Sequence, residues 1–239
     1  RYSVEATIFS KFFLAQFYLG LGRLSDSLRY RDDLQDILVN QSLRNLSTKF
    51  IQNWNNLCWN LSIFLLKQGD LSNGWRLFDH GLQVPTDTQQ KWQRALKKPF
   101  DVSAVPLWRG ENLYGKSLLL LGEQGIGDSM MFLSLIPTLI QEASHIGLFL
   151  PDRLISMYKH SFAHEIKTGN VSIFSRSDFY EKKLLSSRFD YQSPLGSICR
   201  HRFTHPQSFC PRAPVLRCDD ILSDKLRGKY FEHDKTKVE

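Results

Sequence analysis

The sequence predicts a protein of the α plus α/β class, with helical hairpins in its first half and a Rossmann-like parallel α/β domain in its second half. Apolar residues recur with helical spacing over residues 5–38, and a similar pattern returns further along the chain. After residue 113, short apolar runs alternate with helical stretches, and a glycine-rich turn follows the first of these runs. At 239 residues, the chain has room for one large domain or two small ones.

The composition excludes several classes of protein. The net charge of +7 comes from lysines and arginines that are scattered along the chain without a basic-aromatic motif, so we expect no nucleic-acid partner. No apolar run approaches the roughly 18 residues that a membrane helix needs, so we expect no transmembrane segment. Four unevenly spaced cysteines without an export signal predict reduced thiols and a cytoplasmic protein.

Two helical pairs account for residues 1–85. The first pair breaks at Gly20-Leu21-Gly22-Arg23 and the second at Lys67-Gln68-Gly69-Asp70, where a glycine beside a charged residue suits a tight turn between helices. The turn glycines Gly22 and Gly69 lie 47 residues apart. Aligning them places Leu14-Ala15 on Leu61-Ser62, Tyr18 on Leu65, Leu24 on Leu71, Ser27 on Gly74 and Arg29 on Arg76. Small residues recur where the helices of each pair would cross, which predicts an internal repeat.

This repeat resembles the tetratricopeptide repeat, a helical pair of 34 residues with a large-small pair and an aromatic in its first helix. The second copy carries the matching residues Leu61, Ser62, Leu65, Gly69, Gly74, Phe78 and Pro85. The spacing of 47 residues is longer, and we assign the excess to the polar segment 40–53. The resemblance implies a protein partner bound through the helices, whereas an ordinary helical bundle would contain the same helices and stays open as an alternative.

Two such pairs bury little core by themselves, because at least three repeats are normally needed for a stable stack. The chain begins with Arg1 and not with methionine. We therefore expect either further repeats before Arg1 in a longer parent protein or docking of the helical pairs on the domain that follows.

A linker over residues 86–112 precedes a predicted α/β domain over residues 113–220. The linker has no regular period and contains Pro99 and Pro106. The predicted strands are 116–121, 145–150, 171–174 and 189–191, and the predicted helices are 129–143, 152–162 and 178–185. The first strand is a short apolar run bounded by turn residues, as expected of a parallel strand that is buried on both faces. Residues 221–239 are predicted to be a charged tail.

The turn Gly122-Glu123-Gln124-Gly125-Ile126-Gly127-Asp128 links the first strand to the next helix. Its glycines permit a tight reversal and close approach of the backbone, and the free amides at a helix start can hold an anion such as a phosphate. The spacing G-x-x-G-x-G differs from the dinucleotide fingerprint G-x-G-x-x-G, so we predict no nicotinamide cofactor.

Two stretches around this turn resemble a known family. Pro106-Leu107-Trp108-Arg109-Gly110-Glu111-Asn112-Leu113-Tyr114-Gly115-Lys116 and the run from Leu120 to Asp128 resemble bacterial tetratricopeptide-repeat proteins fused to a heptosyltransferase-like glycosyltransferase domain. With Gly69-Asp70, Gly74-Trp75 and Tyr191-Gln192-Ser193-Pro194-Leu195-Gly196-Ser197-Ile198, the resemblance covers roughly residues 55–220. It implies a GT-B architecture, in which the N-terminal Rossmann-like half binds the acceptor and the C-terminal half binds the nucleotide-sugar donor.

The resemblance also implies site residues. The aspartate that closes the family's motif is the proposed general base of an inverting transfer, and the matching residue is Asp128. Such a base takes the proton of the acceptor hydroxyl as its oxygen attacks the anomeric carbon. The substrate-binding candidates are Glu123, Gln124, Gly125, Gly127 and Ser129. Because an aspartate just before an apolar helix is also a favoured N-cap, a purely structural role for Asp128 stays open.

The resemblance ends near Asp219-Asp220, before any second Rossmann-like half. We therefore expect a glycosyltransferase-related protein that is incomplete as an enzyme, with a nucleotide sugar and a glycan or protein acceptor as substrates and no separate cofactor. The alternative is a non-catalytic interaction module, in which the helical pairs bind a protein and the α/β half is vestigial. The residues Cys199, His201, His205 and Cys210 are of zinc-ligand types, but only the two histidines have a typical spacing, so we predict a loop and no metal.

Overall fold

The computed structural model describes residues 4–40, 47–83, 94, 102–123, 125–175, 188–209 and 214–231. The chain divides into two compact units, each made of segments that are far apart in the sequence. The helical unit comprises residues 1–99, 123–125 and 193–211, and the sheet unit comprises residues 100–122, 126–192 and 212–239. Segments 123–125 and 193–211, which the sequence places in the α/β domain, thus pack with the helices.

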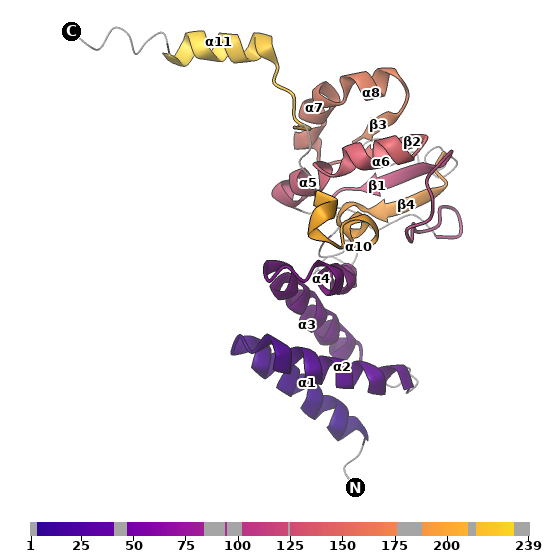
Figure 1. Cartoon of the computed structure of the whole chain (residues 1–239), viewed down its shortest axis with the longest axis vertical. Helices are drawn as coiled ribbons and strands as arrows, with labels where there is room; N and C mark the ends of the chain where they lie inside the picture. The colour runs from indigo at the N-terminus through magenta and orange to yellow at the C-terminus, as the bar shows by residue number, and fades with distance from the viewer. Residues whose placement is uncertain are drawn as a thin grey trace, which may run out of the picture. The chain divides into compact units, whose positions relative to one another are not determined.

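The first hairpin consists of α1 (Val4–Gly20) and α2 (Leu24–Asn40) (Figure 1). Gly22 makes the turn between them with a φ of 71°, a conformation that favours glycine. Where the helices cross, Ser27 Oγ donates a hydrogen bond of 2.6 Å to the carbonyl of Ala15, and both residues are fully buried. The small side chains allow the close approach that the repeat predicts.

The second hairpin consists of α3 (Thr48–Lys67) and α4 (Leu71–Phe78), and the 3-10 turn η2 (Asp79–Leu82) follows it. Gly69 repeats the turn conformation of the first hairpin with a φ of 83°. Asp70 caps α4 by accepting a hydrogen bond of 3.2 Å from the Asn73 amide. At Gly74 the helices are so close that an added Cβ would lie 2.6 Å from Cδ2 of Leu66. Both predicted helical pairs are therefore confirmed as helices.

One apolar core is shared by the two hairpins. Phe50 in the first turn of α3 contacts Phe9 and Phe12 of α1, with ring centroids 5.4 and 5.2 Å apart. The buried members are Ile8, Phe12, Ala15, Leu24, Leu34, Leu38, Phe50, Trp54, Leu57, Cys58, Leu61, Leu65 and Leu77. Burial of these side chains supplies the main stabilising free energy of the helical pairs.

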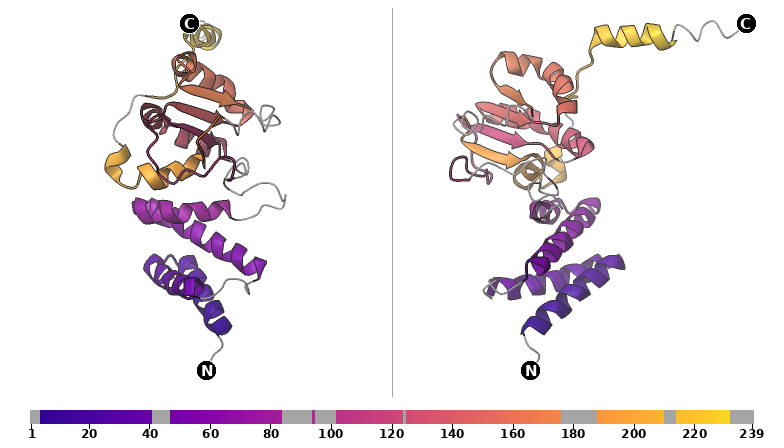
Figure 2. Two further views of the ribbon diagram at one scale, coloured as in Figure 1. Left: turned by 90° about the vertical axis from the view of Figure 1, so that its right-hand side faces the viewer. Right: turned by 180° about the vertical axis from the view of Figure 1, so that it is seen from behind.

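A four-stranded sheet in the order β3-β2-β1-β4 forms the centre of the second half of the fold. The strands are β1 (Ser117–Leu121), β2 (His145–Phe149), β3 (Val171–Phe174) and β4 (Tyr191–Pro194). β1 pairs with β2 and β2 with β3 in parallel, and the last four residues of both β1 and β2 are buried. In Figure 2, β3 and β4 lie at the two edges of the sheet. The predicted α plus α/β class is confirmed at this level.

The helices of the sheet unit follow the strands in alternation. They are α5 (Ile126–Leu133), α6 (Ile136–Glu142), α7 (Asp152–Ser161), α8 (Ala163–Lys167) and the terminal α11 (Asp220–Phe231). The predicted helix 129–143 is wrong as one element, because it begins at Ile126 and is interrupted before Ile136, where Pro137 lies in the first turn of a new helix. The predicted helix 178–185 lies outside the described residues.

Three short elements complete the helical unit: η4 (Leu195–Ile198), α10 (Cys199–Arg202) and η5 (Pro206–Phe209). They follow β4 directly along the chain. Within the segments that the structure describes, every helix is too short or too polar to cross a bilayer.

Candidate functional site

The start of α5 lies at the point where the strand order of the sheet reverses. The chain moves from β1 to β2 and β3 on one side of β1, and then returns to place β4 on its other side. In open α/β sheets, ligands bind beyond the carboxyl ends of the strands at such a reversal. The segment that leaves β1 and enters α5 occupies this position, and it contains Asp128.

Asp128 is the third residue of α5, and its side chain is exposed. Of the two roles left open for it, the N-cap role does not fit this position, because α5 begins two residues earlier at Ile126. A carboxylate in the first turn still interacts favourably with the positive end of the helix dipole. The carboxylate is thus presented to solvent at the start of a helix, where an incoming hydroxyl group can reach it.

The glycines of this segment differ in what they do. Gly122 donates its backbone N–H to the carbonyl of Phe149 at 2.8 Å, and an added Cβ would lie 2.8 Å from that same oxygen. The predicted close backbone approach is therefore present at Gly122. Gly127 has no positive φ, so the segment enters α5 without left-handed backbone at this glycine. At Gly127, which is exposed, no atom lies within 4 Å of an added Cβ, which leaves space beside the Asp128 backbone.

The other predicted substrate-binding residues are placed differently from one another. Ser129 is fully buried, and Gly125 is partly exposed. Gln124 lies outside the described residues. Glu123 is only 1% exposed and belongs to the helical unit. Of this set, the structure brings Gly127 and Asp128 together at an exposed position in the sheet unit.

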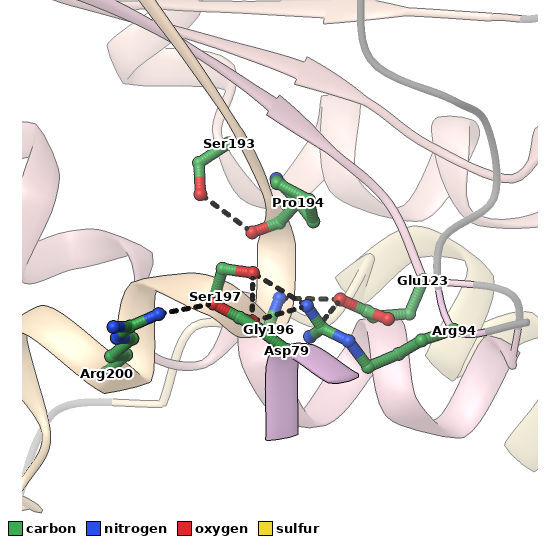
Figure 3. Close-up of polar contacts among 8 residues, drawn as sticks. All are labelled: Asp79, Arg94, Glu123, Ser193, Pro194, Gly196, Ser197 and Arg200. Carbon is green, nitrogen blue, oxygen red and sulfur yellow. Dashed lines mark hydrogen bonds and ion pairs between the residues drawn. The ribbon is translucent and has the colours of Figure 1, made fainter. Parts of the chain in front are cut away.

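Glu123 belongs to a buried ionic network centred on Arg94 in the helical unit (Figure 3). Arg94 Nη1 lies 3.2 Å from Glu123 Oε1, and Arg94 Nη2 lies 3.0 Å from Asp79 Oδ1 and 2.6 Å from Ser197 Oγ. Glu123 Oε1 also accepts a hydrogen bond of 2.6 Å from the Gly196 amide. We call these five residues the Arg94 network.

Several further contacts hold the network in place. The Ser197 hydroxyl donates to Asp79 Oδ1 at 2.7 Å, and Arg200 Nη1 lies 3.5 Å from Asp79 Oδ2. The Arg94 guanidinium also lies over the ring of Phe78, 4.4 Å from its centroid, in cation–π geometry. Because Arg94 and Glu123 are almost completely buried, each charge depends on these partners to offset the cost of leaving water.

Sequence reasoning missed the Arg94 network apart from Glu123. Its members come from the end of α4, the linker, the end of β1 and the turn after β4. No motif or periodicity links residues so far apart in the chain. The one usable signal was the resemblance at residues 191–198, which includes Gly196 and Ser197.

Burial also changes the acid–base chemistry of several side chains in the helical unit. Desolvation lowers the pKa of His80 from 6.5 to about 4, and the nearby positive charge of Arg31 adds to this effect. Desolvation raises the pKa of Cys58 to about 12 and raises the pKa of Cys199 still further. Both thiols are therefore protonated at neutral pH, and neither is poised as a nucleophile or as a metal ligand.

The zinc-ligand types noted in the sequence are placed as follows. Cys199 begins α10 and is buried, while Cys210 lies outside the described residues. Among the residues that the structure describes, no three His, Cys, Asp or Glu side chains are grouped closely enough to hold a metal ion.

The described residues thus form helical hairpins and a parallel α/β sheet. The exposed Asp128 carboxylate lies where the strand order of the sheet reverses, a position at which open α/β sheets bind ligands. Over 164 residues, the chain is 24% identical to Protein FlbA of Caulobacter vibrioides. The aligned region makes up 65% of this chain and 26% of FlbA, so the chain spans about a quarter of that protein's length. No protein-family model and no solved structure match the chain.

Proposed function

We propose that the chain is the acceptor-side part of a glycosyltransferase-related protein that transfers sugar from a nucleotide-sugar donor. The observation that carries the proposal is the exposed Asp128 carboxylate in the first turn of α5, at the strand reversal beside β1. The resemblance of residues 106–128 to heptosyltransferase-like domains supports the same reaction. The proposal also assigns the helical hairpins to the tetratricopeptide repeat and the α/β domain to the N-terminal half of a GT-B fold.

The proposed mechanism uses Asp128 as a general base. Its carboxylate takes the proton from an acceptor hydroxyl while that oxygen forms a bond to the anomeric carbon of the donor sugar. The bond from the anomeric carbon to the diphosphate oxygen breaks at the same time, and the nucleoside diphosphate leaves with the bonding electrons. Removal of a general base of this kind typically costs a factor of about 10² to 10⁴ in rate.

The first prediction concerns Asp128→Asn in the parent enzyme whose acceptor side this chain forms under the proposal, because donor hydrolysis requires the donor-binding half as well. Nucleoside diphosphate release from a panel of nucleotide-diphosphate sugars is the measurement, with water or an added glycan as acceptor. We expect release by the wild type with at least one donor and a loss of about 10²-fold or more in the variant, because amide replacement removes the base. Asp220→Asn is the matched control, since Asp220 is also an exposed carboxylate in the first turn of a helix. Equal rates for wild type and Asp128→Asn would contradict the proposal, as would a wild type that releases nothing from any donor.

The second candidate function is a non-catalytic interaction module. The observation that favours it is α1, which carries apolar side chains on its exposed side as well as in the core. In this case, partner capture by the helices survives Asp128→Ala, and no donor is consumed.

A further inference from the structure

The outer side of α1 carries a row of exposed apolar side chains. Phe9, Phe13, Phe17 and Leu21 follow one another at intervals of four residues, so they lie along one side of the helix and of the turn that ends it. Their exposed fractions are 46%, 61%, 60% and 57%. Large apolar side chains that gather on one exposed side of a helix mark a surface that another molecule covers. We call these four residues the α1 ridge.

The second hairpin shows that its architecture does not require such a ridge. With the internal repeat aligned on the turn glycines, the four ridge positions correspond to Asn56, Asn60, Phe64 and Gln68 of the second hairpin. Three of these four residues are polar, and Asn60 and Gln68 are exposed. The second hairpin thus has polar, exposed residues at two of the positions where the first hairpin has exposed apolar ones. The exposed rings of Phe13 and Phe17 therefore serve a purpose other than holding the hairpin together.

The rings of the α1 ridge are held in position by neighbouring aromatics. Phe13 contacts Phe12 edge-on at 5.7 Å between centroids, and Phe17 contacts Tyr18 in the same way at 5.6 Å. Phe9 is held against Phe50 of α3 at 5.4 Å. Because these rings are already ordered, covering them costs less conformational entropy than covering free side chains.

Charge favours a second copy of this chain as the occupant. The other exposed residues on this part of α1 are uncharged: Ala6, Ser10, Gln16 and Gly20. Lys11, on the neighbouring side, is paired with Asp33 of α2. Two copies with a net charge of +7 each repel one another across most surfaces, but here the exposed side of α1 is uncharged, and Arg23, two residues beyond Leu21, is paired with Asp26.

The area is also sufficient. A large aromatic side chain presents roughly 200 Å² when fully exposed, so the α1 ridge presents roughly 400 Å² at the exposures above. Two copies would bury roughly 800 Å² from the ridges alone, and the flanking uncharged residues bring the total to about the 1,000 Å² of a specific interface. A ridge at intervals of four residues also fits between the ridges of a second helix in the commonest mode of helix packing.

We propose that this protein forms a symmetric homodimer in which the α1 ridges of two copies pack against each other. The proposal deepens the second candidate function by naming the partner, and it involves no residue of the catalytic proposal. Loss of dimerisation would leave donor hydrolysis unchanged, so the two proposals fail separately.

The test is sedimentation velocity of the 239-residue chain over a hundredfold range of concentration, for the wild type, Phe13→Asp, Phe17→Asp and Phe64→Asp. We expect a concentration-dependent dimer for the wild type and a dissociation constant at least tenfold larger for both ridge variants. Phe64→Asp is the matched control, because Phe64 is the exposed phenylalanine at the position equivalent to Phe17, and it should dimerise like the wild type.

Circular dichroism shows whether each variant keeps its helices, which it should because the altered side chains are exposed. For any variant that loses helix, Phe13→Ser or Phe17→Ser replaces it in the same experiment. A wild type that remains monomeric throughout, or ridge variants that dimerise as tightly as the wild type, would overturn the proposal. Binding of the monomer to lipid vesicles through the α1 ridge would overturn it as well.

Discussion

His80 is a residue of the helical unit whose pKa is lowered by burial within the pH range of ordinary buffers. It lies in η2, and its Nδ1 is 2.8 Å from Asn55 Oδ1 on α3. The neutral ring with a proton on Nδ1 donates a hydrogen bond to this oxygen. Desolvation first, and then the positive charge of Arg31, lower the pKa of His80 to about 4. The ring therefore stays neutral in the folded protein at pH values where the unfolded chain already binds a proton.

This difference predicts acid sensitivity of the helical unit. Because the unfolded state binds more protons between pH 6.5 and about 4, the contribution of His80 to the free energy of unfolding is fully present above pH 6.5. This contribution is lost as the pH falls through the window. The maximum slope is about 1.4 kcal/mol per pH unit, which gives a loss of about 3 kcal/mol from this residue. Urea unfolding of the wild type and His80→Gln at pH 7 and pH 4.5 measures this loss of free energy.

We expect the variant to lose less free energy of unfolding than the wild type over this range. His164→Gln is the control, since His164 is exposed on α8, and it should follow the wild type. If His80→Gln and the wild type lose the same free energy on acidification, His80 does not control the acid sensitivity.

At the scale of elements, the crossing of α3 and α4 depends on Gly74. An added Cβ there would lie 2.6 Å from Cδ2 and 2.7 Å from Cγ of Leu66, and 3.2 Å from the Leu66 backbone nitrogen. The leucine side chain can move, but the close contact with the backbone nitrogen is relieved only if the two helices move apart. We expect Gly74→Ala to lower the free energy of unfolding by about 1 to 3 kcal/mol, as in overpacked cores.

Gly20→Ala is the comparison for this prediction. Gly20 ends α1, and no atom lies within 4 Å of an added Cβ there. Alanine at a helical position without crowding should be neutral or stabilising by up to about 1 kcal/mol. Thermal and urea unfolding of both variants measure the difference. A neutral Gly74→Ala would mean that Leu66 can move without cost and that the helices are not in close contact there.

Most elements of the fold could be predicted from local sequence patterns. Both hairpin turns were identified from glycines that do adopt positive φ, and β3 was predicted with the bounds Val171–Phe174 that the structure has. The sequence places the fourth strand at residues 189–191, and the structure shows β4 at Tyr191–Pro194. Strand ends of this kind depend on pairing with a neighbour, here between Asp190 and Ser117, which a local pattern does not contain.

The candidate site could be predicted only in part. Asp128 was proposed from the family resemblance of residues 106–128, which a continuous stretch of sequence carries: an apolar strand followed by a glycine turn. Its exposure and its place within the first turn of α5 depend on where the helix starts, which the sequence misplaced by three residues. Arg94 had no local signal at all, because its partners are brought together only by the tertiary fold.

At the scale of the whole molecule, the helical unit is discontinuous in sequence. The Arg94 network joins its three parts, with Asp79 and Arg94 from residues 1–99, Glu123 from residues 123–125, and Gly196 and Ser197 from residues 193–211. Chain segments that are far apart in the sequence lose conformational entropy when they are brought together, so strong tertiary contacts are needed to keep them joined. Buried charges with several hydrogen-bonded partners supply such contacts and also specify one arrangement.

The final prediction is that Arg94 stabilises the helical unit selectively. Arg94→Met retains the apolar stem but leaves the buried Glu123 carboxylate without its positive partner, which typically costs about 3 to 5 kcal/mol. The double variant Arg94→Met/Glu123→Gln removes both charges, while the amide oxygen can still accept the hydrogen bond from Gly196. It should therefore be more stable than Arg94→Met alone. Hydrogen exchange followed by mass spectrometry should show faster exchange in α3, α4 and residues 195–202 of Arg94→Met than in β1 and β2. Equal acceleration in all of these segments, or a double variant no more stable than the single one, would contradict a specific role of this ion pair in joining the unit.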